Sequence, residues 1–198
     1  MRTIISGILG CLLVLGSLPS RANELELMAI APDHVGMTVR KSPVLYYFIS
    51  QATSHPTRFT LLGYRKTAPV ADVALTSPTH PGFWAIRLTD DQIVLDEDVQ
   101  YRGFVGVIPD PGPRAADIVT GGMIKRVDPR LSDYYGCQCD RDEVRFLLKA
   151  GIWYDGFACL IELIEANSND RTLRRLREDL LKGSTGLVPL LSARSISV

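Results

Sequence analysis

Between Leu25 and Val127 the chain alternates short apolar runs with turn residues and shows no helical periodicity. In the run Thr57 to Tyr64, the apolar residues Phe59 and Leu61 alternate with polar ones, which is the period of a strand with one buried face. Such runs recur about every 10 to 15 residues, a spacing typical of antiparallel sandwiches and barrels. The pattern predicts strands near positions 25–30, 44, 59, 70, 83, 101 and 118–127.

One pair of residues in this region makes the prediction more specific. Leu95 lies six residues before Tyr101, which opens an apolar run. In immunoglobulin-like sandwiches, a tyrosine at the E to F corner bonds upstream backbone through its hydroxyl while its ring enters the core. We therefore expect structural roles for Leu95 and Tyr101 and a seven-stranded antiparallel sandwich over 23–128. It resembles a fibronectin type III domain more than an antibody domain, because no cysteine lies on its expected strands B or F.

The C-terminal third changes to helical periodicity. Asp140 with Glu143 three positions later forms a capping-box variant that opens a first helix, and Gly151 interrupts it. Apolar side chains from Trp153 to Ile164 follow at helical spacing, and Asp170 caps a third helix. The segments expected here are a linker at 129–140, a helical hairpin of about three helices at 141–186 and a tail at 187–198.

The hairpin carries one apolar stripe on each arm. An amphipathic helix of this kind gains most of its stability from packing rather than from propensity. The stripe must therefore be buried against the sandwich or against another protein. The sequence leaves open which of the two covers it.

The N-terminal residues 1–22 predict a secretory signal peptide. Arg2 precedes an apolar run at 4–15, which is too short to span a bilayer, and Ser20-Arg-Ala22 fits the small-x-small rule for cleavage. A lipoprotein signal ending at Cys11 is the alternative. The expected location is the periplasm, with surface association left open and no transmembrane segment in the mature chain.

Charge gives no sign of a nucleic-acid partner. The chain has 22 basic and 22 acidic residues, and removal of 1–22 takes Arg2 and Arg21 with it, leaving 20 basic against 22 acidic. A protein that binds phosphate backbones carries an excess of Lys and Arg instead.

Three cysteines remain after residue 22: Cys137, Cys139 and Cys159. In an oxidising compartment we expect a disulfide from Cys159 to Cys137 or Cys139, because a ring closed between Cys137 and Cys139 would be strained. A zinc site would need a ligand from His34, His55 or His80, which lie in separate stretches. A redox catalyst usually has two residues between its cysteines, not one. We therefore predict no metal and no cofactor. The alternative to the disulfide is a buried, unpaired Cys159.

No catalytic motif is visible in the sequence. A Gly-x-Ser-x-Gly elbow, a phosphate-cradling loop and a zinc-protease helix are all missing. We predict a protein that is not an enzyme and has no catalytic residues. The enzyme hypothesis that remains is a site assembled from dispersed residues such as His34, His55 and Asp72.

Aromatic and arginine side chains supply the candidate contact residues, since such residues dominate binding hot spots. The proline-stiffened connection before the last strand is a candidate contact loop. The arginines of the third helix, Arg171 to Arg177, are expected to form a solvated face that can meet an acidic partner. The interface candidates are Tyr46, Tyr47, Phe83, Pro111, Arg114, Trp153, Tyr154, Arg174 and Arg177.

Several stretches together resemble the bacterial domain-of-unknown-function 928 family, from about Asp33 to Leu187. The stretches are Asp33-His-Val-Gly36, Pro43-Val-Leu-Tyr-Tyr47, Phe83-Trp-Ala-Ile-Arg-Leu88, Tyr101-Arg-Gly-Phe104, Ile118-Val-Thr-Gly-Gly-Met-Ile124 and Ala150-Gly-Ile-Trp-Tyr-Asp-Gly156. The resemblance implies an exported protein and carries over no catalytic residue. The Cys137-Gln-Cys139 pair is not part of the resemblance.

These features lead to one functional expectation and one alternative. We expect a non-enzymatic periplasmic interaction or assembly module, an accessory or scaffold subunit that binds other envelope proteins or its own copies. The alternative is a sandwich that binds a small ligand or glycan. Its sign would be Trp84 or Trp153 exposed on a concave face.

Overall fold

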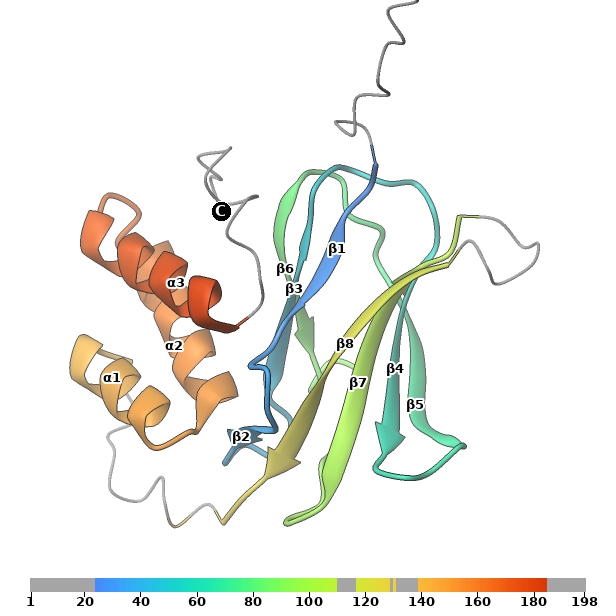
Figure 1. Ribbon diagram of the computed structural model, residues 1–198, viewed down its shortest axis with the longest axis horizontal. Coiled ribbons are helices and arrows are strands. Elements are labelled where there is room, and N and C mark those ends of the chain that lie inside the picture. Colours follow the sequence, from blue (N-terminus) through green and yellow to red (C-terminus); the bar gives the residue numbers. More distant parts are fainter. Residues whose placement is uncertain (1–23, 110–116, 129, 131–138, 185–198) are drawn as a thin grey trace, which may run out of the picture.

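The structure is a computed structural model that describes residues 24–109, 117–128, 130 and 139–184. These residues form eight strands followed by three helices (Figure 1). The strands are β1 Leu27–Ile30, β2 Gly36–Thr38, β3 Val44–Ile49, β4 Thr57–Gly63, β5 Pro69–Leu75, β6 Gly82–Arg87, β7 Gln100–Val107 and β8 Ile118–Arg126. The helices are α1 Arg141–Lys149, α2 Trp153–Ala166 and α3 Arg171–Ser184. A mainly β chain with three C-terminal helices is confirmed.

The strands form two sheets packed face to face. One has the order β1-β3-β6 and the other the order β2-β8-β7-β4-β5. Neighbouring strands are antiparallel except β2, which runs parallel to β8. Tyr47 and Ile86 of the first sheet meet Phe59 and Leu61 of the second in one hydrophobic core. On β4 the polar Arg58, directly before Phe59, is exposed, as the alternation predicts.

Strand β2 is an element that the sequence did not predict. It spans three residues, begins at a glycine and pairs Gly36 with Ile124 of β8. A Cβ at Gly36 would lie 2.5 Å from Cε2 of Tyr154, so only glycine lets this strand pass beneath α2. So short a run contains too few residues to show a period.

Tyr101 lies at the start of β7 with its ring buried and 2% exposed. Its hydroxyl accepts a hydrogen bond from the backbone N–H of Asp96 at 3.1 Å and donates to the Asp96 carboxylate at 3.2 Å. Leu95 is fully buried beside it. These contacts fix the turn that leads into β7.

Side-chain caps begin two of the three helices. Oδ1 of Asp140 accepts from the backbone N–H groups of Asp142 and Glu143 at 2.9 and 2.8 Å, which opens α1. Asp170 does the same for α3, accepting from Thr172 and Leu173. Gly151 has φ +77°, a left-handed conformation that favours glycine, and it redirects the chain from α1 into α2.

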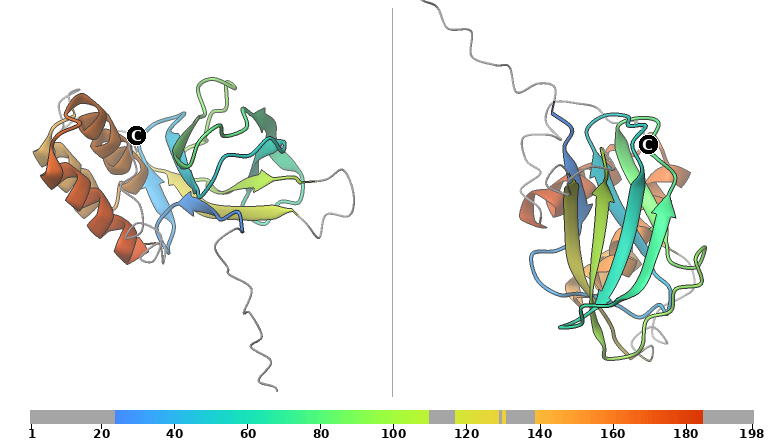
Figure 2. Two further views of the ribbon diagram at one scale, coloured as in Figure 1. Left: turned by 90° about the horizontal axis from the view of Figure 1, so that it is seen from above. Right: turned by 90° about the vertical axis from the view of Figure 1, so that its right-hand side faces the viewer.

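The helices lie together on one side of the sandwich, with α2 against β2 and β3 (Figures 1 and 2). Trp153, Tyr154, Phe157 and Ile161 of α2 belong to the same buried core as the strands. The chain's own sandwich therefore covers the apolar stripe of α2. A second, smaller core lies among the helices, around Val144, Cys159, Leu160, Ile164 and Leu173. No helix among the described residues is both long and apolar enough to cross a membrane.

Candidate functional site

Two places in the structure combine polar groups with unusual packing: the joint between α2 and the sandwich, and a groove beside β8. The joint centres on Asp155, whose carboxylate is 4% exposed although it lies in the first turn of a helix. It accepts from the Thr38 hydroxyl at 3.0 and 3.1 Å and from the Val39 N–H at 2.8 Å. Arg40 Nε lies 3.5 Å from the same carboxylate.

Burial and the neighbouring polar groups shift the pKa of Asp155 in opposite directions. Burial raises the pKa of Asp155 above its ordinary value, while the Val39 N–H, the Thr38 hydroxyl and the Arg40 guanidinium act to lower it. All these partners belong to the end of β2 and the residues after it, so the carboxylate fastens α2 to that strand. Tyr154 adds a second fastening, because its hydroxyl donates to the Met123 carbonyl of β8 at 3.0 Å. The Asp155 carboxylate is thus buried among partners within the chain, and the joint serves the fold.

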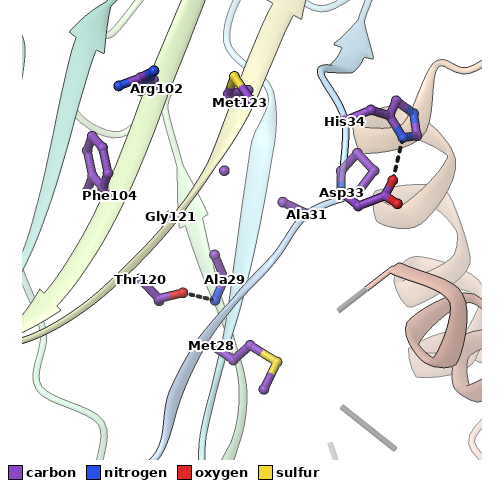
Figure 3. Close-up of a pocket in the computed structure, with 12 residues that line it drawn as sticks. Met28, Ala29, Ala31, Asp33, His34, Arg102, Phe104, Thr120, Gly121 and Met123 are labelled. Atoms are coloured by element: carbon purple, nitrogen blue, oxygen red, sulfur yellow. Dashed lines mark hydrogen bonds and ion pairs between the residues drawn. The ribbon is translucent and has the colours of Figure 1, made fainter. Parts of the chain in front are cut away.

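The groove lies where β1 and the residues after it approach β7 and β8 (Figure 3). It is open to solvent and has a volume of about 460 Å³, within the range of pockets that hold ligands. Its walls are residues from Met28 to His34 on one side and Arg102 and Phe104 of β7 on the other, with Thr120 to Met123 of β8 between them.

Two glycines shape the groove. A Cβ at Gly121 would lie 2.5 Å from the Gly103 carbonyl oxygen and 2.7 Å from Cδ1 of Phe104, so the Phe104 ring rests directly on the β8 backbone. A Cβ at Gly122 would lie 2.4 Å from Cβ of Ala31, so the segment after β1 approaches β8 closely. The Thr120 hydroxyl accepts from the Ala29 N–H at 3.0 Å and holds β1 there.

The lining is apolar in the middle and charged on two sides. Met28, Phe104 and Met123 are half-buried, so part of each side chain remains open to the groove. Arg102 lies on the β7 side and the Asp33–His34 pair on the opposite side (Figure 3). The Arg102 guanidinium lies 5.6 Å from the centroid of the Tyr64 ring and forms no salt bridge with any residue of the described ranges.

Four of the nine expected interface residues lie inside the molecule. Tyr47, Trp153, Tyr154 and Arg177 are buried, which places them in contacts within the chain rather than on its surface. Tyr46 is half-buried and packs edge-on against Phe157 at a centroid distance of 5.4 Å. For Tyr47, Trp153 and Tyr154 the expectation of a surface site is wrong, because they lie in the core where the sheets and α2 pack together.

The arginine face of α3 also differs from the expectation. Arg177 is only 4% exposed, and its guanidinium lies 4.9 Å from the centroid of the half-buried Phe83 ring. Arg174 is half-buried and donates to the Ser168 carbonyl. Arg171 and Arg175 remain exposed. Pro111 and Arg114 of the expected contact loop lie outside the described residues.

The residues proposed for catalysis or metal binding do not come together. His34 bonds its neighbour Asp33, with Nδ1 and Oδ1 2.8 Å apart, whereas Asp72 of β5 accepts from Arg58 and Thr60. His55 lies in the turn before β4, and His80 stacks on Trp84 with their ring centroids 4.8 Å apart. Within the ranges that the structure describes, no group of three or more His, Cys, Asp or Glu residues is arranged to hold a metal ion.

Two of the three candidate disulfide cysteines lie together. Cys139 precedes the cap of α1 and packs on the cluster that contains Cys159 of α2. Both are free thiols in this structure. Cys137 lies outside the described residues.

The sequence alone did not single out Asp155 as a joint or the two adjacent glycines of β8 as groove formers. Asp155 stood at the end of the distinctive Gly151-Ile-Trp-Tyr-Asp155 stretch, and a charged residue in the middle of an apolar stripe is a usable signal of a buried partner. Gly121 and Gly122 interrupt a strand pattern, which indicates close backbone approach.

Comparison with known proteins identifies a family for the chain. No curated protein matches the chain. A family model described as Domain of Unknown Function (DUF928) matches residues 16–194, nearly the full length and including both the joint and the groove. The chain therefore belongs to the DUF928 family.

Proposed function

We propose that this protein is an exported, non-enzymatic binding and assembly module that holds a segment of a partner protein in the groove beside β8. The observation that carries the proposal is the groove itself, preformed between rigid strands, apolar at its centre and charged on two sides. Binding sites on stable scaffolds have this character. Because the chain's own core covers the apolar stripe of α2, we prefer the groove to the helical hairpin as the contact surface.

We further propose an immunoglobulin-like or fibronectin-III-like sandwich as the scaffold. Its support is the strand order, three strands β1-β3-β6 against a sheet that contains β8-β7-β4-β5, together with the Tyr101 hydroxyl bonded to Asp96 upstream. Such sandwiches present binding surfaces on many unrelated proteins. The fold alone implies no activity, so the function rests on the groove.

The groove suits an extended peptide that carries an apolar side chain and an acidic group. Methionine side chains adapt to different apolar partners, and two of them, Met28 and Met123, line the groove together with Phe104. Arg102 has no carboxylate partner among the described residues and offers a bidentate donor to one. An acidic and apolar segment of an envelope protein, or of a second copy of this chain, fits this chemistry.

A glycan is the weaker occupant. Trp153 is 6% exposed and stacks on Phe157, so its indole offers no face to a sugar. The indole N–H of Trp84 donates to the His80 carbonyl, and the His80 ring stacks on one face of the indole. Neither tryptophan lines the groove.

A peptide library displayed on phage tests the binding proposal. We expect the protein to enrich peptides with an acidic residue near an aliphatic or aromatic one. Arg102→Glu should weaken the binding of a selected peptide at least tenfold by calorimetry, because it places like charges together. Arg175→Glu is the matched control, since it reverses the charge of an exposed arginine on α3, away from the groove, and should leave binding unchanged.

Two results would contradict the proposal. One is a selected peptide whose affinity is the same for wild type and Arg102→Glu. The other is enrichment of no peptide while tryptophan fluorescence responds to cell-wall sugars, which would favour the glycan alternative.

Export is proposed separately, on the apolar run at 4–15 and the small-x-small motif that ends at Ala22. We expect the chain recovered from the periplasm of a bacterial host to begin at Asn23. Intact-mass measurement checks this. A cytoplasmic protein that retains residues 1–22 would exclude export.

A further inference from the structure

We propose that Cys139 and Cys159 form a disulfide that fastens the start of α1 to the middle of α2. This inference is independent of the proposed function and concerns how the helical layer is held together. It also assigns Cys139, and not Cys137, as the partner of Cys159.

The two residues come from different elements and meet in the small core among the helices. Cys139 lies directly before Asp140, the residue that caps α1, and is half-buried. Cys159 lies on the buried face of α2 and is 1% exposed. Val144, Leu160 and Leu173 surround them and fix the position of α2 relative to the start of α1.

The contacts of the thiols place them side by side. Cys139 packs against the buried cluster to which Cys159 belongs, and each thiol shifts the pKa of the other. The Cys139 thiol also donates to Oε2 of Glu162 at 3.2 Å, and Glu162 lies one turn after Cys159 on α2. Cys139 is thus held over the turn of α2 that carries Cys159, which is the approach that a disulfide requires.

The alternative pairings are less favourable. A bond between Cys137 and Cys139 would close a ring over a single intervening residue and would be strained. A bond from Cys137 to Cys159 would have to displace Cys139 from the position that it already occupies beside Cys159. Cys137 is then left with a free thiol.

The chemistry is a two-electron oxidation. Each thiol gives up one proton and one electron, an S–S bond forms, and a disulfide of an oxidising partner, either a thiol oxidoreductase or a low-molecular-weight disulfide, is reduced to two thiols. Exchange proceeds through a mixed disulfide after attack by a thiolate.

The surroundings decide when this step happens. Burial raises the pKa of both thiols, and the Glu162 carboxylate raises it further, so little thiolate exists once the helices have packed. Cys159 is also shielded from any reagent. The bond therefore forms early, before α1 closes over α2.

Peptide mapping of the protein recovered from an oxidising compartment tests the proposal, with alkylation and without reduction. Trypsin leaves Cys137 and Cys139 on one peptide, 131–141, and Cys159 on another, 150–171. We expect these peptides to be linked, with two hydrogens lost. We expect the link to persist in Cys137→Ser and to disappear in Cys139→Ser.

Thermal unfolding gives a second readout. Closing a loop of about 20 residues should raise the melting temperature, so reduction should lower it by about 5–10 °C in wild type and in Cys137→Ser. The same reduction should leave Cys139→Ser unchanged. Three alkylatable thiols, or a link that persists in Cys139→Ser, would overturn the proposal.

Discussion

At the scale of single residues, Asp155 is the side chain on which the attachment of the helices depends most. A buried carboxylate that receives two hydrogen bonds and one ion pair is costly to leave partly satisfied. Asp155→Ala leaves the Thr38 hydroxyl and the Val39 N–H without their acceptor. We expect a loss of about 2–4 kcal/mol in the free energy of unfolding, measured by urea denaturation.

The pH dependence of this residue has a defined sign. Because burial raises the pKa of Asp155 in the folded state, its stabilising contribution is complete below the ordinary carboxyl pKa of about 4 and is lost as the pH rises through the raised value. Asp155→Asn removes this titration. The stability difference between wild type and Asp155→Asn should therefore shrink between pH 4 and pH 7. A difference that grows over the same range would mean that the ion pair with Arg40 outweighs burial.

Gly122 sets how closely β1 and its following segment approach β8. Gly122→Ala would place a Cβ 2.4 Å from Cβ of Ala31, and the segment must move to relieve the overlap. We expect a loss of about 2–4 kcal/mol in urea denaturation. Gly106→Ala on β7 is the control, since its nearest neighbour would lie at 3.4 Å, and should cost less than about 1 kcal/mol. Equal costs for the two variants would contradict the close approach.

At the scale of elements, α2 forms part of the sandwich core. Phe157 is fully buried, stacks on Trp153 at a centroid distance of 5.0 Å and meets Tyr46 of β3 edge-on. Phe157→Ala should cost about 3–5 kcal/mol, because it leaves a cavity at this contact. Glu165→Ala on the exposed side of the same helix should change stability by less than about 0.5 kcal/mol.

Individual strands and helices could be predicted from the sequence, but their packing against each other could not. Alternation at Phe59 and Leu61 and the cap at Asp140 predict their strand and helix because both signals are local. The position of α2 depends on contacts between residues far apart in the chain, such as Asp155 with Thr38, and no local pattern encodes these. Arg177 shows the same limit, since helical spacing gives no sign that a β6 ring lies beneath it.

The groove could not be predicted from the sequence, for a related reason. Gly121 and Gly122 gave a local sign of close approach, but which segment approaches them is decided by the packing of β1 on β8. The interface candidates were chosen for their aromatic and arginine side chains. The same side chains also suit a core, and four of the nine candidates are buried there.

At the scale of the whole molecule, strands and helices share one hydrophobic core, and the groove beside β8 is the proposed binding surface. Native-state hydrogen exchange on the full chain, followed by mass spectrometry at rising denaturant, tests this most directly. We predict that amides of α2, β3 and β7 exchange through the same opening, with equal free energies and denaturant dependence. Exchange of α2 through a separate opening of low free energy, while β3 and β7 stay protected, would contradict the shared core.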